Sequence, residues 1–257
     1  MPLSCVFVSF VDDPLAPPPL EILYEDNHCL AVVKPGGVAS AHYEGKDETL
    51  DRAAKSYLKE KYHKRGNVFL GIVHRLDKPV SGVLLFARTS KAAARLARQF
   101  RDGSVEKVYW AVVEDQVSGH SAHVTPWAKQ DVGSLEDWLK KDDPAARVEV
   151  EPESTPGARF ARLLFTVRGR YDGLTWLELR PHTGRKHQLR VQLAARGCPI
   201  YGDAKYGSDR PFGPAIALHA RGLTFLHPTT REPVALKADV PTAWRGRFAH
   251  LLANGPA

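Results

Sequence analysis

The sequence predicts an α+β protein built on a mixed, largely antiparallel β-sheet with flanking helices. Apolar runs with the length of strands follow one another directly along much of the chain, and only three segments show the apolar spacing of a helix. A doubly wound parallel sheet would instead place a helix between nearly every pair of strands. The chain has 257 residues, of which 43% are hydrophobic and 25% charged, so it is long enough for one large globular domain.

Residues 1–20 are predicted to be an extended lead-in to a single domain that spans residues 21–257. The lead-in contains four prolines, which exclude a helix interior: Pro14, Pro17, Pro18 and Pro19. The apolar run at residues 3–11 has no basic residue before it and is followed by two aspartates, so it favours a strand over a signal peptide or a membrane span. Three widely separated cysteines favour a reducing compartment, and we expect a cytoplasmic protein that does not enter a membrane.

In the first half of the domain, short strands alternate with helices. Residues 29–34 form an apolar strand that ends at a Pro-Gly-Gly sequence, and residues 83–87 form another apolar strand. Between them, residues 50–62 carry apolar side chains at helical spacing and predict an amphipathic helix. Thr89 is a suitable N-cap for a second amphipathic helix that continues to Arg101.

In the second half, strands dominate. Residues 172–173 are an Asp-Gly pair between apolar runs, which predicts a two-residue hairpin turn. Thr183 is predicted to cap a last helix that ends at Gly197 and Pro199. The acidic segment at residues 131–153 is predicted to be an insertion or arm between strands. The strands of this half are predicted at residues 108–113, 160–167, 174–179, 218–226 and 234–237.

Charge is unevenly distributed along a chain whose formal net charge is +7. Residues 78–101, which include Arg95 and Arg98, contain six cations and no acid, and residues 180–196 contain five cations and no acid. Residues 131–153 contain eight acids and three cations. A positive excess is compatible with nucleic acid, an anionic membrane surface, acidic ligands or no partner. Its segregation indicates a surface more positive than the net charge suggests, which is typical of a nucleic-acid-binding face.

The common cofactor and metal motifs are absent from the sequence. There is no phosphate-binding loop that ends in Gly-Lys-Ser/Thr and no Gly-x-Gly-x-x-Gly after a strand. There is no His-Glu-x-x-His and no Cys-x-x-Cys. His182 and His187 lie close together, but their spacing of five suits neither face of a helix well. We therefore expect neither a nucleotide cofactor nor a metal.

The segment of residues 71–82 places His74, Arg75 and Asp77 on a turn between two apolar runs. Functional side chains are often displayed on such a turn because rigid strands hold it on both sides. The alternative is an ordinary polar turn in which Asp77 accepts hydrogen bonds from nearby backbone N–H groups and Arg75 is solvated.

Two further clusters are candidates for ligand contacts. Arg185 and Lys186 lie where the last helix is predicted to begin, and helix N-terminal N–H groups with nearby cations can bind phosphate. Lys107 and Tyr109 are two residues apart on a predicted strand, so they share one face of it. Each cluster also has a simpler explanation, namely a solvated basic helix face and a tyrosine that packs in a sheet.

Considered together, the clusters have a familiar order and spacing. His-Arg-Leu-Asp at residues 74–77 is followed by Ser-Gly at 81–82, Lys-x-Tyr at 107–109 and Thr-Gly-Arg-Lys-His-Gln-Leu-Arg at 183–190. This arrangement resembles the RluA-type family of RNA pseudouridine synthases. The resemblance covers nearly everything after residue 20. It extends through residues 23–26, 33–36, 200–203, 218–220, 227–228 and 238–241.

The resemblance implies a pseudouridine synthase-like fold with an active-site cleft across the sheet. It implies that Asp77 is the catalytic aspartate, that Tyr109 stacks on the target uracil and that Arg190 pairs with the aspartate. Arg75 matches a position whose side chain can enter the RNA stack where the base has left. Val80 departs from the family, which usually has Thr before Ser-Gly. Larger relatives carry a small N-terminal RNA-binding domain, for which this chain has no room.

The implied activity is the isomerisation of specific uridines to pseudouridine in structured RNA, either ribosomal or transfer RNA, by base flipping. The reaction imports no group and oxidises nothing, so it needs no cofactor, and one carboxylate can act as nucleophile or as base. We expect Arg190 to hold this carboxylate in a bidentate pair that keeps it ionised. We expect a monomer. The residues expected to contact RNA are His74, Arg75, Arg95, Arg98, Lys107, Arg185 and Lys186.

Two other functions remain open at this stage. The same basic surface would serve an RNA-binding or RNA-folding module with little or no turnover. A hydrolase that uses His74 and Asp77 is a further possibility, although the sequence has no nucleophile motif such as Gly-x-Ser-x-Gly.

Overall fold

The structure is a computed structural model that describes residues 20–41, 49–115, 127, 130–142 and 147–253. The predicted lead-in, apart from residue 20, and the apolar run at residues 3–11 lie outside this part of the chain. The strands are β1 (Ile22–Glu25), β2 (Cys29–Lys34), β3 (Gly71–Ile72), β4 (Ser81–Ala87), β5 (Glu106–Glu114), β6 (Val132–Asp142), β7 (Arg147–Glu151), β8 (Arg159–Tyr171), β9 (Leu174–Pro181), β10 (Leu218–Leu226) and β11 (Pro233–Lys237). The helices are α1 (Leu50–Lys61), α2 (Ser90–Asp102), α3 (Gln188–Ala194), α4 (Thr242–Arg247), α5 (Ala249–Ala253) and the 3₁₀ turn η2 (Ala204–Tyr206).

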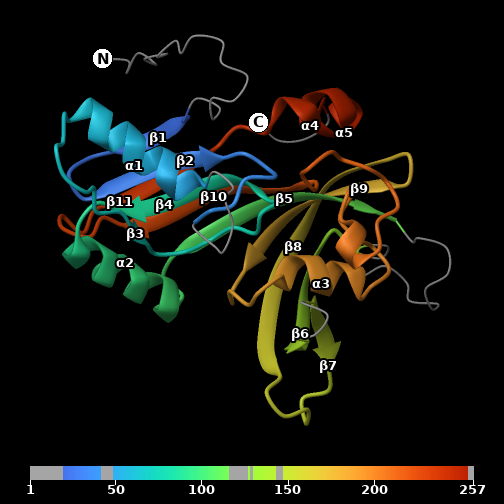
Figure 1. The fold of residues 1–257 in the computed structure, drawn as a ribbon. Helices are drawn as coiled ribbons and strands as arrows, with labels where there is room; N and C mark the ends of the chain where they lie inside the picture. The colour runs from blue at the N-terminus through green and yellow to red at the C-terminus, as the bar shows by residue number, and fades with distance from the viewer. Residues whose placement is uncertain (1–19, 42–48, 116–126, 128–129, 143–146, 254–257) are drawn as a thin grey trace.

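The strands form one mixed, mostly antiparallel sheet, which confirms the predicted fold class. Their order is β1-β2-β4-β10-β5-β9-β8-β6-β7, with β3 beside β4 and β11 beside β10 (Figure 1). β4 and β10 run parallel, and the neighbouring pairs β2–β4 and β5–β10 are antiparallel. No helix in the described part of the chain is long and apolar enough to cross a membrane.

Helices α1 and α2 cover opposite faces of the β1-β2-β4-β10 part of the sheet (Figure 1). Successive side chains of a strand point to opposite faces. Leu30, Val32, Leu84 and Phe86 therefore share a buried cluster with α1, whereas Cys29, Ala31, Val83 and Leu85 share one with α2. Thr89 caps α2 as predicted, because its Oγ1 accepts a hydrogen bond from the backbone N–H of Ala92 at 3.2 Å. The predicted helices at residues 50–62 and 89–101 are thus confirmed.

The other part of the sheet is built on the predicted hairpin. Asp172 and Gly173 have φ angles of 50° and 69°, as a type I′ turn requires, and they join β8 to β9. The acidic segment at residues 131–153 contains β6 and β7, which extend the sheet beyond β8. Leu139 and Val148 of these strands pack against Val191 of α3, so α3 covers this end of the sheet (Figure 1).

The start of the last helix differs from the sequence prediction. Helix α3 begins at Gln188, and its N-cap is His187, whose φ is 52°. Thr183 does not cap the helix, because its hydroxyl donates to the side-chain oxygen of Gln188 at 2.7 Å and accepts the backbone N–H of Arg162. The predicted cap at Thr183 was therefore wrong. Residues 183–187 instead form a loop between β9 and α3, and the basic side chains of Arg185 and Lys186 lie on that loop.

Gly82 allows β4 and β10 to approach closely. Its φ is +116°, and a Cβ atom at this position would lie 2.3 Å from the carbonyl oxygen of Ala220. A side chain here would require both a rare backbone conformation and a displacement of β10. The Ser-Gly sequence that follows residues 74–77 is therefore explained in part by sheet geometry.

Two C-terminal helices were not predicted. α4 and α5 bury Trp244, Phe248 and Leu251 against the main core. The two helices have six and five residues and meet at Phe248, so neither is long enough to show a helical period in the sequence.

Candidate active site

Asp77 lies on a loop that the backbone holds firmly. The loop follows β3 and leads into β4. The N–H of Gly37 donates to the carbonyl of Lys78 at 2.8 Å, and the N–H of Ile216 donates to the carbonyl of Pro79 at 3.1 Å. The hydroxyl of Ser40 donates to the carbonyl of Leu76 and accepts the N–H of the same residue. Asp77 is therefore held on a rigid turn, as the sequence suggested.

Lys34 holds the same loop through hydrogen bonds of its ammonium group. It is fully buried, and its ammonium donates to the carbonyls of Pro35, Val38 and Lys78 at 2.9, 2.6 and 3.0 Å. These three bonds use all three N–H donors of the ammonium. Burial lowers the pKa of Lys34 to about 7, and the nearby charge of Asp77 opposes this shift.

Arg190 connects two carboxylates. Its Nη1 lies 3.1 Å from Oδ2 of Asp77, while its Nε and Nη2 donate to both oxygens of Asp203 at 2.6 and 2.7 Å. The bidentate pair therefore forms with Asp203 and not with Asp77, in contrast to our expectation from the sequence. The side chain of Asp203 is 1% exposed and that of Arg190 is 5% exposed, so Asp203 holds the guanidinium where it can bind Asp77.

One oxygen of Asp77 remains available. The Asp77 side chain is 30% exposed, and Oδ2 is the oxygen that Arg190 binds. Among the described residues, no hydrogen bond reaches Oδ1. Burial acts to lower the pKa of Arg190, but hydrogen bonds to Asp203 and the charges of Asp203 and Asp77 raise it above its ordinary value. Arg190 is thus a permanent cation next to the carboxylate of Asp77.

Tyr109 and Lys107 come from β5, the central strand beside the loop. Tyr109 is paired with Leu179 of β9 and Ala220 of β10, so its position in the sheet is fixed on both sides. Burial and the charge of Asp77 raise the pKa of Tyr109, which keeps the phenol neutral. Burial also lowers the pKa of Lys107. The two side chains share a face of the strand, as the sequence predicted.

Asp77, Lys107, Tyr109 and Arg190 line one cleft with a volume of about 1000 Å³. Among the described residues, the charged groups that line it are eight cations and one acid, Asp77. The cations are Arg75, Lys78, Arg101, Lys107, Lys141, Arg185, Lys186 and Arg190. The structure thus brings together Asp77, Tyr109, Arg190, His74, Arg75, Lys107, Arg185 and Lys186 of the predicted site residues.

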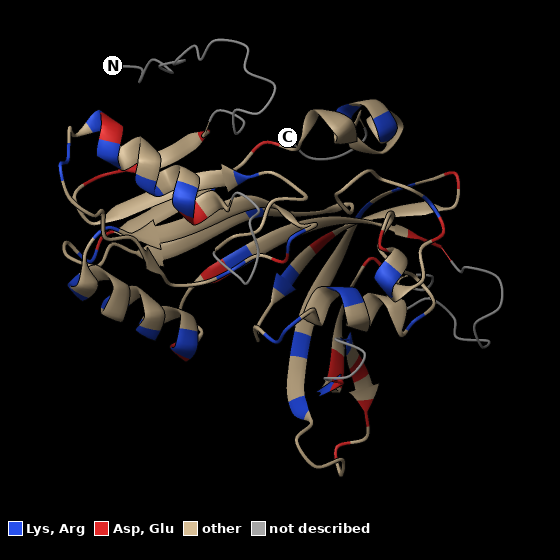
Figure 2. Ribbon diagram, in the orientation of Figure 1, with Lys and Arg blue, Asp and Glu red and all other residues tan. Residues whose placement is uncertain are grey.

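Arg95 and Arg98 are not among the lining residues of this cleft. Both lie on α2, which carries several cations along its length (Figure 2). Nη1 of Arg95 donates to the carbonyl of Pro228 at 2.7 Å. Phe100 and Arg101, at the C-terminal end of α2, do line the cleft. The cations of α2 therefore begin at the edge of the cleft and continue along the helix.

His74 lies in the cleft wall but is engaged with the protein. Its Nε2 accepts the backbone N–H of Leu85 at 2.9 Å, and its ring stacks on Phe100 at 4.5 Å between centroids. Burial lowers the pKa of His74 to about 3. His74 is therefore neutral near pH 7 and has no positive charge with which to attract phosphate.

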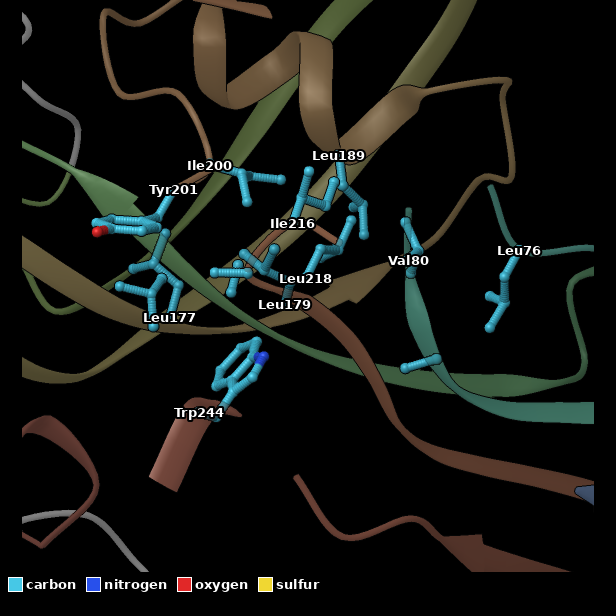
Figure 3. Packing of buried hydrophobic residues seen from close by; sticks show 14 of the residues in the cluster. Leu76, Val80, Leu177, Leu179, Leu189, Ile200, Tyr201, Ile216, Leu218 and Trp244 are labelled. Atoms are coloured by element: carbon cyan, nitrogen blue, oxygen red, sulfur yellow. The ribbon is translucent and has the colours of Figure 1, made fainter. Parts of the chain in front are cut away.

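The floor of the cleft is apolar. Leu76, Val80, Leu189 and Leu218 belong both to the main core and to the lining of the cleft (Figure 3). Val80, the residue that departs from the family pattern, is 3% exposed and packs in this core. A methyl group in place of a hydroxyl suits that position, because a buried hydroxyl would need a hydrogen-bond partner.

Sequence reasoning assigned no role to Asp203, Tyr206 or Lys34, although they shape the site. Lys34 and Asp203 could have been found from the sequence, because they lie in residues 33–36 and 200–203, where the chain resembles the family. Tyr206 contacts His187 and Arg190 from η2.

A group of potential metal ligands lies away from the cleft. Asp26, Cys29 and His227 bring one ligand atom each within 4.8 Å of one another. Nε2 of His227 is 2.7 Å from Asp26, and Nδ1 of the ring accepts the backbone N–H groups of Thr229 and Thr230. Burial raises the pKa of Cys29 to about 12, so the thiol is protonated. This group joins the β1–β2 turn to the β10–β11 turn and offers no free lone pair on the histidine.

A carboxylate bound to a buried arginine, beside a tyrosine and within a cleft lined by cations, defines an enzyme site for a polyanionic substrate. The chain belongs to the RNA pseudouridylate synthase family, whose family model matches residues 28–195.

Curated relatives agree with this assignment. A tRNA pseudouridine synthase C from Vibrio cholerae is 30% identical over 236 residues, which cover 88% of this chain and 93% of the relative. A tRNA pseudouridine synthase C from Salmonella typhimurium is 35% identical over 240 residues, with 88% and 87% covered. A ribosomal large subunit pseudouridine synthase D from Zymomonas mobilis is 33% identical over 248 residues, with 91% and 73% covered.

Solved structures support the fold. Human RNA Pseudouridylate Synthase Domain Containing 4 superposes with a TM-score of 0.68 at 23% identity and covers 91% of this chain and 92% of its own. Human RNA Pseudouridylate Synthase Domain Containing 1 superposes with a TM-score of 0.67 at 25% identity, with 87% and 84% covered. The family predicted from the sequence and its fold are therefore confirmed.

Proposed function

We propose that this protein isomerises specific uridines to pseudouridine in structured RNA and that Asp77 opens the glycosidic bond. The observation that carries the proposal is the Asp77–Arg190 pair, which lies with Tyr109 in a single cleft lined by cations. Membership of the RNA pseudouridylate synthase family supports an isomerase that acts on RNA.

The reaction exchanges one bond for another within the same nucleotide. The N1–C1′ bond of uridine breaks, the base rotates, a C5–C1′ bond forms, and the proton on C5 is lost while N1 gains one. Asp77 begins this sequence through Oδ1, either by attack on the nucleoside or by removal of a sugar proton. Arg190 holds Oδ2 and so orients the carboxylate for either route.

The target base has to leave the RNA stack to reach Asp77. Base flipping costs a few kcal/mol, and stacking of a base on an aromatic side chain recovers about 1–3 kcal/mol. Tyr109, held in the central sheet and neutral, provides the aromatic face. Arg75 is exposed on the loop that carries Asp77, so it can occupy the space that the base leaves. The apolar floor of the cleft limits the access of water to the reacting atoms.

The substrate is proposed to be transfer or ribosomal RNA, because the relatives carry names of both kinds. The cations of the cleft bind the phosphates on either side of the flipped nucleotide. We propose that the enzyme acts as a monomer in the cytoplasm. The buried thiol of Cys29 supports a reducing compartment.

Release of tritium from C5 tests the function. RNA labelled at C5 of uridine loses its label to water when C5 becomes bonded to C1′. We expect the wild-type protein to release tritium from a fraction of cellular RNA, and fractionation into transfer and ribosomal RNA identifies the substrate. If the protein binds RNA but releases no tritium from any fraction, the proposed function is wrong and an RNA-binding module remains.

The cationic lining predicts a strong dependence of RNA binding on salt. Each phosphate contact contributes about 0.7–0.9 to the slope of log Kd against log salt concentration. We expect Lys186→Gln, at the cleft, to weaken binding and to reduce the slope by about that amount. Arg98→Gln tests whether RNA also follows α2, and Lys237→Gln, an exposed cation outside the cleft lining, is the control. If Lys186→Gln and Lys237→Gln give equal slopes, the loop between β9 and α3 does not contact the phosphates of the RNA.

A further inference from the structure

Three contacts connect the β6–β7 hairpin to the carboxylate of Asp77. The backbone N–H of Val148 on β7 donates to the Tyr206 hydroxyl at 3.1 Å. That hydroxyl lies 2.8 Å from Nδ1 of His187. Nε2 of His187 lies 3.8 Å from Oδ2 of Asp77, the same oxygen that Arg190 binds.

These contacts indicate which ring nitrogen of His187 carries the proton. The Tyr206 oxygen accepts the N–H of Val148, and its own hydrogen has Nδ1 of His187 as its partner in the described structure. Burial raises the pKa of Tyr206, so the phenol keeps that hydrogen near neutral pH. Nδ1 therefore accepts, and in the neutral ring the proton lies on Nε2 and faces Asp77.

The surroundings keep His187 neutral. Burial lowers the pKa of His187 to about 4, although the charge of Asp77 opposes this shift. The positive charges of neighbouring side chains act in the same direction as burial. The charged or titratable groups around the ring are Asp77 on the catalytic loop, Lys186 on the β9–α3 loop, Arg190 on α3, and Lys205 and Tyr206 on η2.

Tyr206 also supports Arg190. The guanidinium carbon of Arg190 lies 5.0 Å from the centre of the Tyr206 ring, which is cation–π distance. Asp203, three residues earlier, binds the other edge of the same guanidinium. Asp203 thus holds the edge of the Arg190 guanidinium, and the Tyr206 ring lies against its face. The hydroxyl of Tyr206 also holds His187.

We propose that His187 is a positioning residue for the isomerisation. Tyr206 orients the ring so that its Nε2–H faces Oδ2 of Asp77. His187 and Arg190 together restrain this oxygen and leave Oδ1 free to react. This inference rests on the proposed function. A neutral donor suits the role, because it restrains the carboxylate without adding a second full charge that would pair with it. The loop conformation of His187, with a φ of 52°, places the ring beside Asp77 directly before α3 begins.

A pair of substitutions with similar size isolates the N–H group. His187→Gln keeps an N–H near the position of Nε2, whereas His187→Leu removes it. We expect the single-turnover rate of His187→Leu to fall about 3- to 10-fold, and that of His187→Gln to stay clearly higher, since the contact at 3.8 Å is longer and weaker than a full hydrogen bond to a charged group. RNA affinity should not separate the two variants. His63 is exposed with a φ of 49°, so His63→Gln and His63→Leu control for the backbone conformation.

Tyr206→Phe tests the orientation of the His187 ring. The aromatic ring over Arg190 remains, and burial still keeps His187 neutral. Nδ1 of His187 loses the hydroxyl that donates to it, so the neutral ring can carry its proton on either nitrogen and Nε2 no longer always donates towards Asp77. We expect the single-turnover rate of Tyr206→Phe to fall towards that of His187→Leu, and we expect the same change to have little effect in the His187→Leu background, where there is no ring to orient.

The outcomes separate this inference from the proposed function. If wild-type protein releases no tritium, the function itself fails. If wild-type protein is active but His187→Gln and His187→Leu react at equal rates, His187 has only a structural role. A Tyr206→Phe variant that reacts at the wild-type rate would likewise overturn the orientation by Tyr206. A loss of thermal stability in Tyr206→Phe does not affect this comparison, because the rate is measured on folded protein.

Discussion

Asp77→Asn is expected to abolish pseudouridine formation while the protein still folds and binds RNA. The amide has nearly the size of the carboxylate, but it can neither attack the nucleoside nor accept a sugar proton. We expect the single-turnover rate to fall by about 10⁴-fold or more, the scale seen when a central catalytic group is removed. Tritium release from C5-labelled RNA measures the rate, and direct detection of pseudouridine confirms it.

The fold should survive this change because the loop between β3 and β4 does not depend on the Asp77 side chain. Backbone bonds from Gly37 and Ile216, together with Lys34, hold the loop. Arg190 keeps its two hydrogen bonds to Asp203, so its buried charge remains paired. Asp172→Asn is a matched control, since Asp172 is exposed in a hairpin turn at a φ of 50° that asparagine adopts readily.

A variant with more than about 1% of the wild-type rate would exclude Asp77 as the group that opens the bond, since that residual rate is far above the 10⁴-fold loss expected. The acid would then have to come from elsewhere. Among the described residues that line the cleft, Asp77 is the one carboxylate, so such a result would contradict the placement of the reaction beside Arg190 and Tyr109.

The local fold was predictable where a short pattern determines the structure. Residues 29–34, Thr89 and the Asp-Gly pair at residues 172–173 each contain their own signal, namely an apolar run, a capping hydroxyl and a turn that favours positive φ. Thr183 contains the same capping signal as Thr89. The structure uses it differently, because Gln188 lies within reach of the hydroxyl and the chain continues as a loop.

The core of the site was predictable only through the combination of distant motifs. No local pattern places Asp77 beside Arg190, which is 113 residues later in the chain, and the resemblance supplied that pairing. The sequence also could not rank the carboxylates. Arg190 was expected to form its bidentate pair with Asp77, yet Asp203 competes for it and is almost fully buried, so the stronger pair forms where solvent does not compete. That distribution of contacts leaves Asp77 partly exposed, which its proposed role requires.

Arg190→Lys is expected to be severely damaging although it preserves the charge. The guanidinium supplies two N–H groups to Asp203 and a third to Asp77 in one plane, and an ammonium on a shorter reach cannot reproduce that geometry. Lysine can satisfy one carboxylate at most, and the buried Asp203 is the one that burial favours. Asp77 then loses the cation that holds Oδ2, and we expect the single-turnover rate to fall at least about 100-fold, as for a lost charge-assisted hydrogen bond.

The same variant should also be less stable, so a control has to separate the two effects. Disruption of a buried ion pair costs about 3–5 kcal/mol, which corresponds to a decrease in Tm of roughly 6–20 °C for a domain of this size. Arg196 provides the comparison, because it forms its own two-pronged pair with Asp137 at 2.9 and 3.1 Å and does not line the cleft. Arg196→Lys should lower Tm without slowing the single-turnover rate of folded protein at 25 °C. If Arg190→Lys likewise loses only stability and retains wild-type turnover, then Arg190 supports Asp203 and the fold but has no part in the chemistry at Asp77.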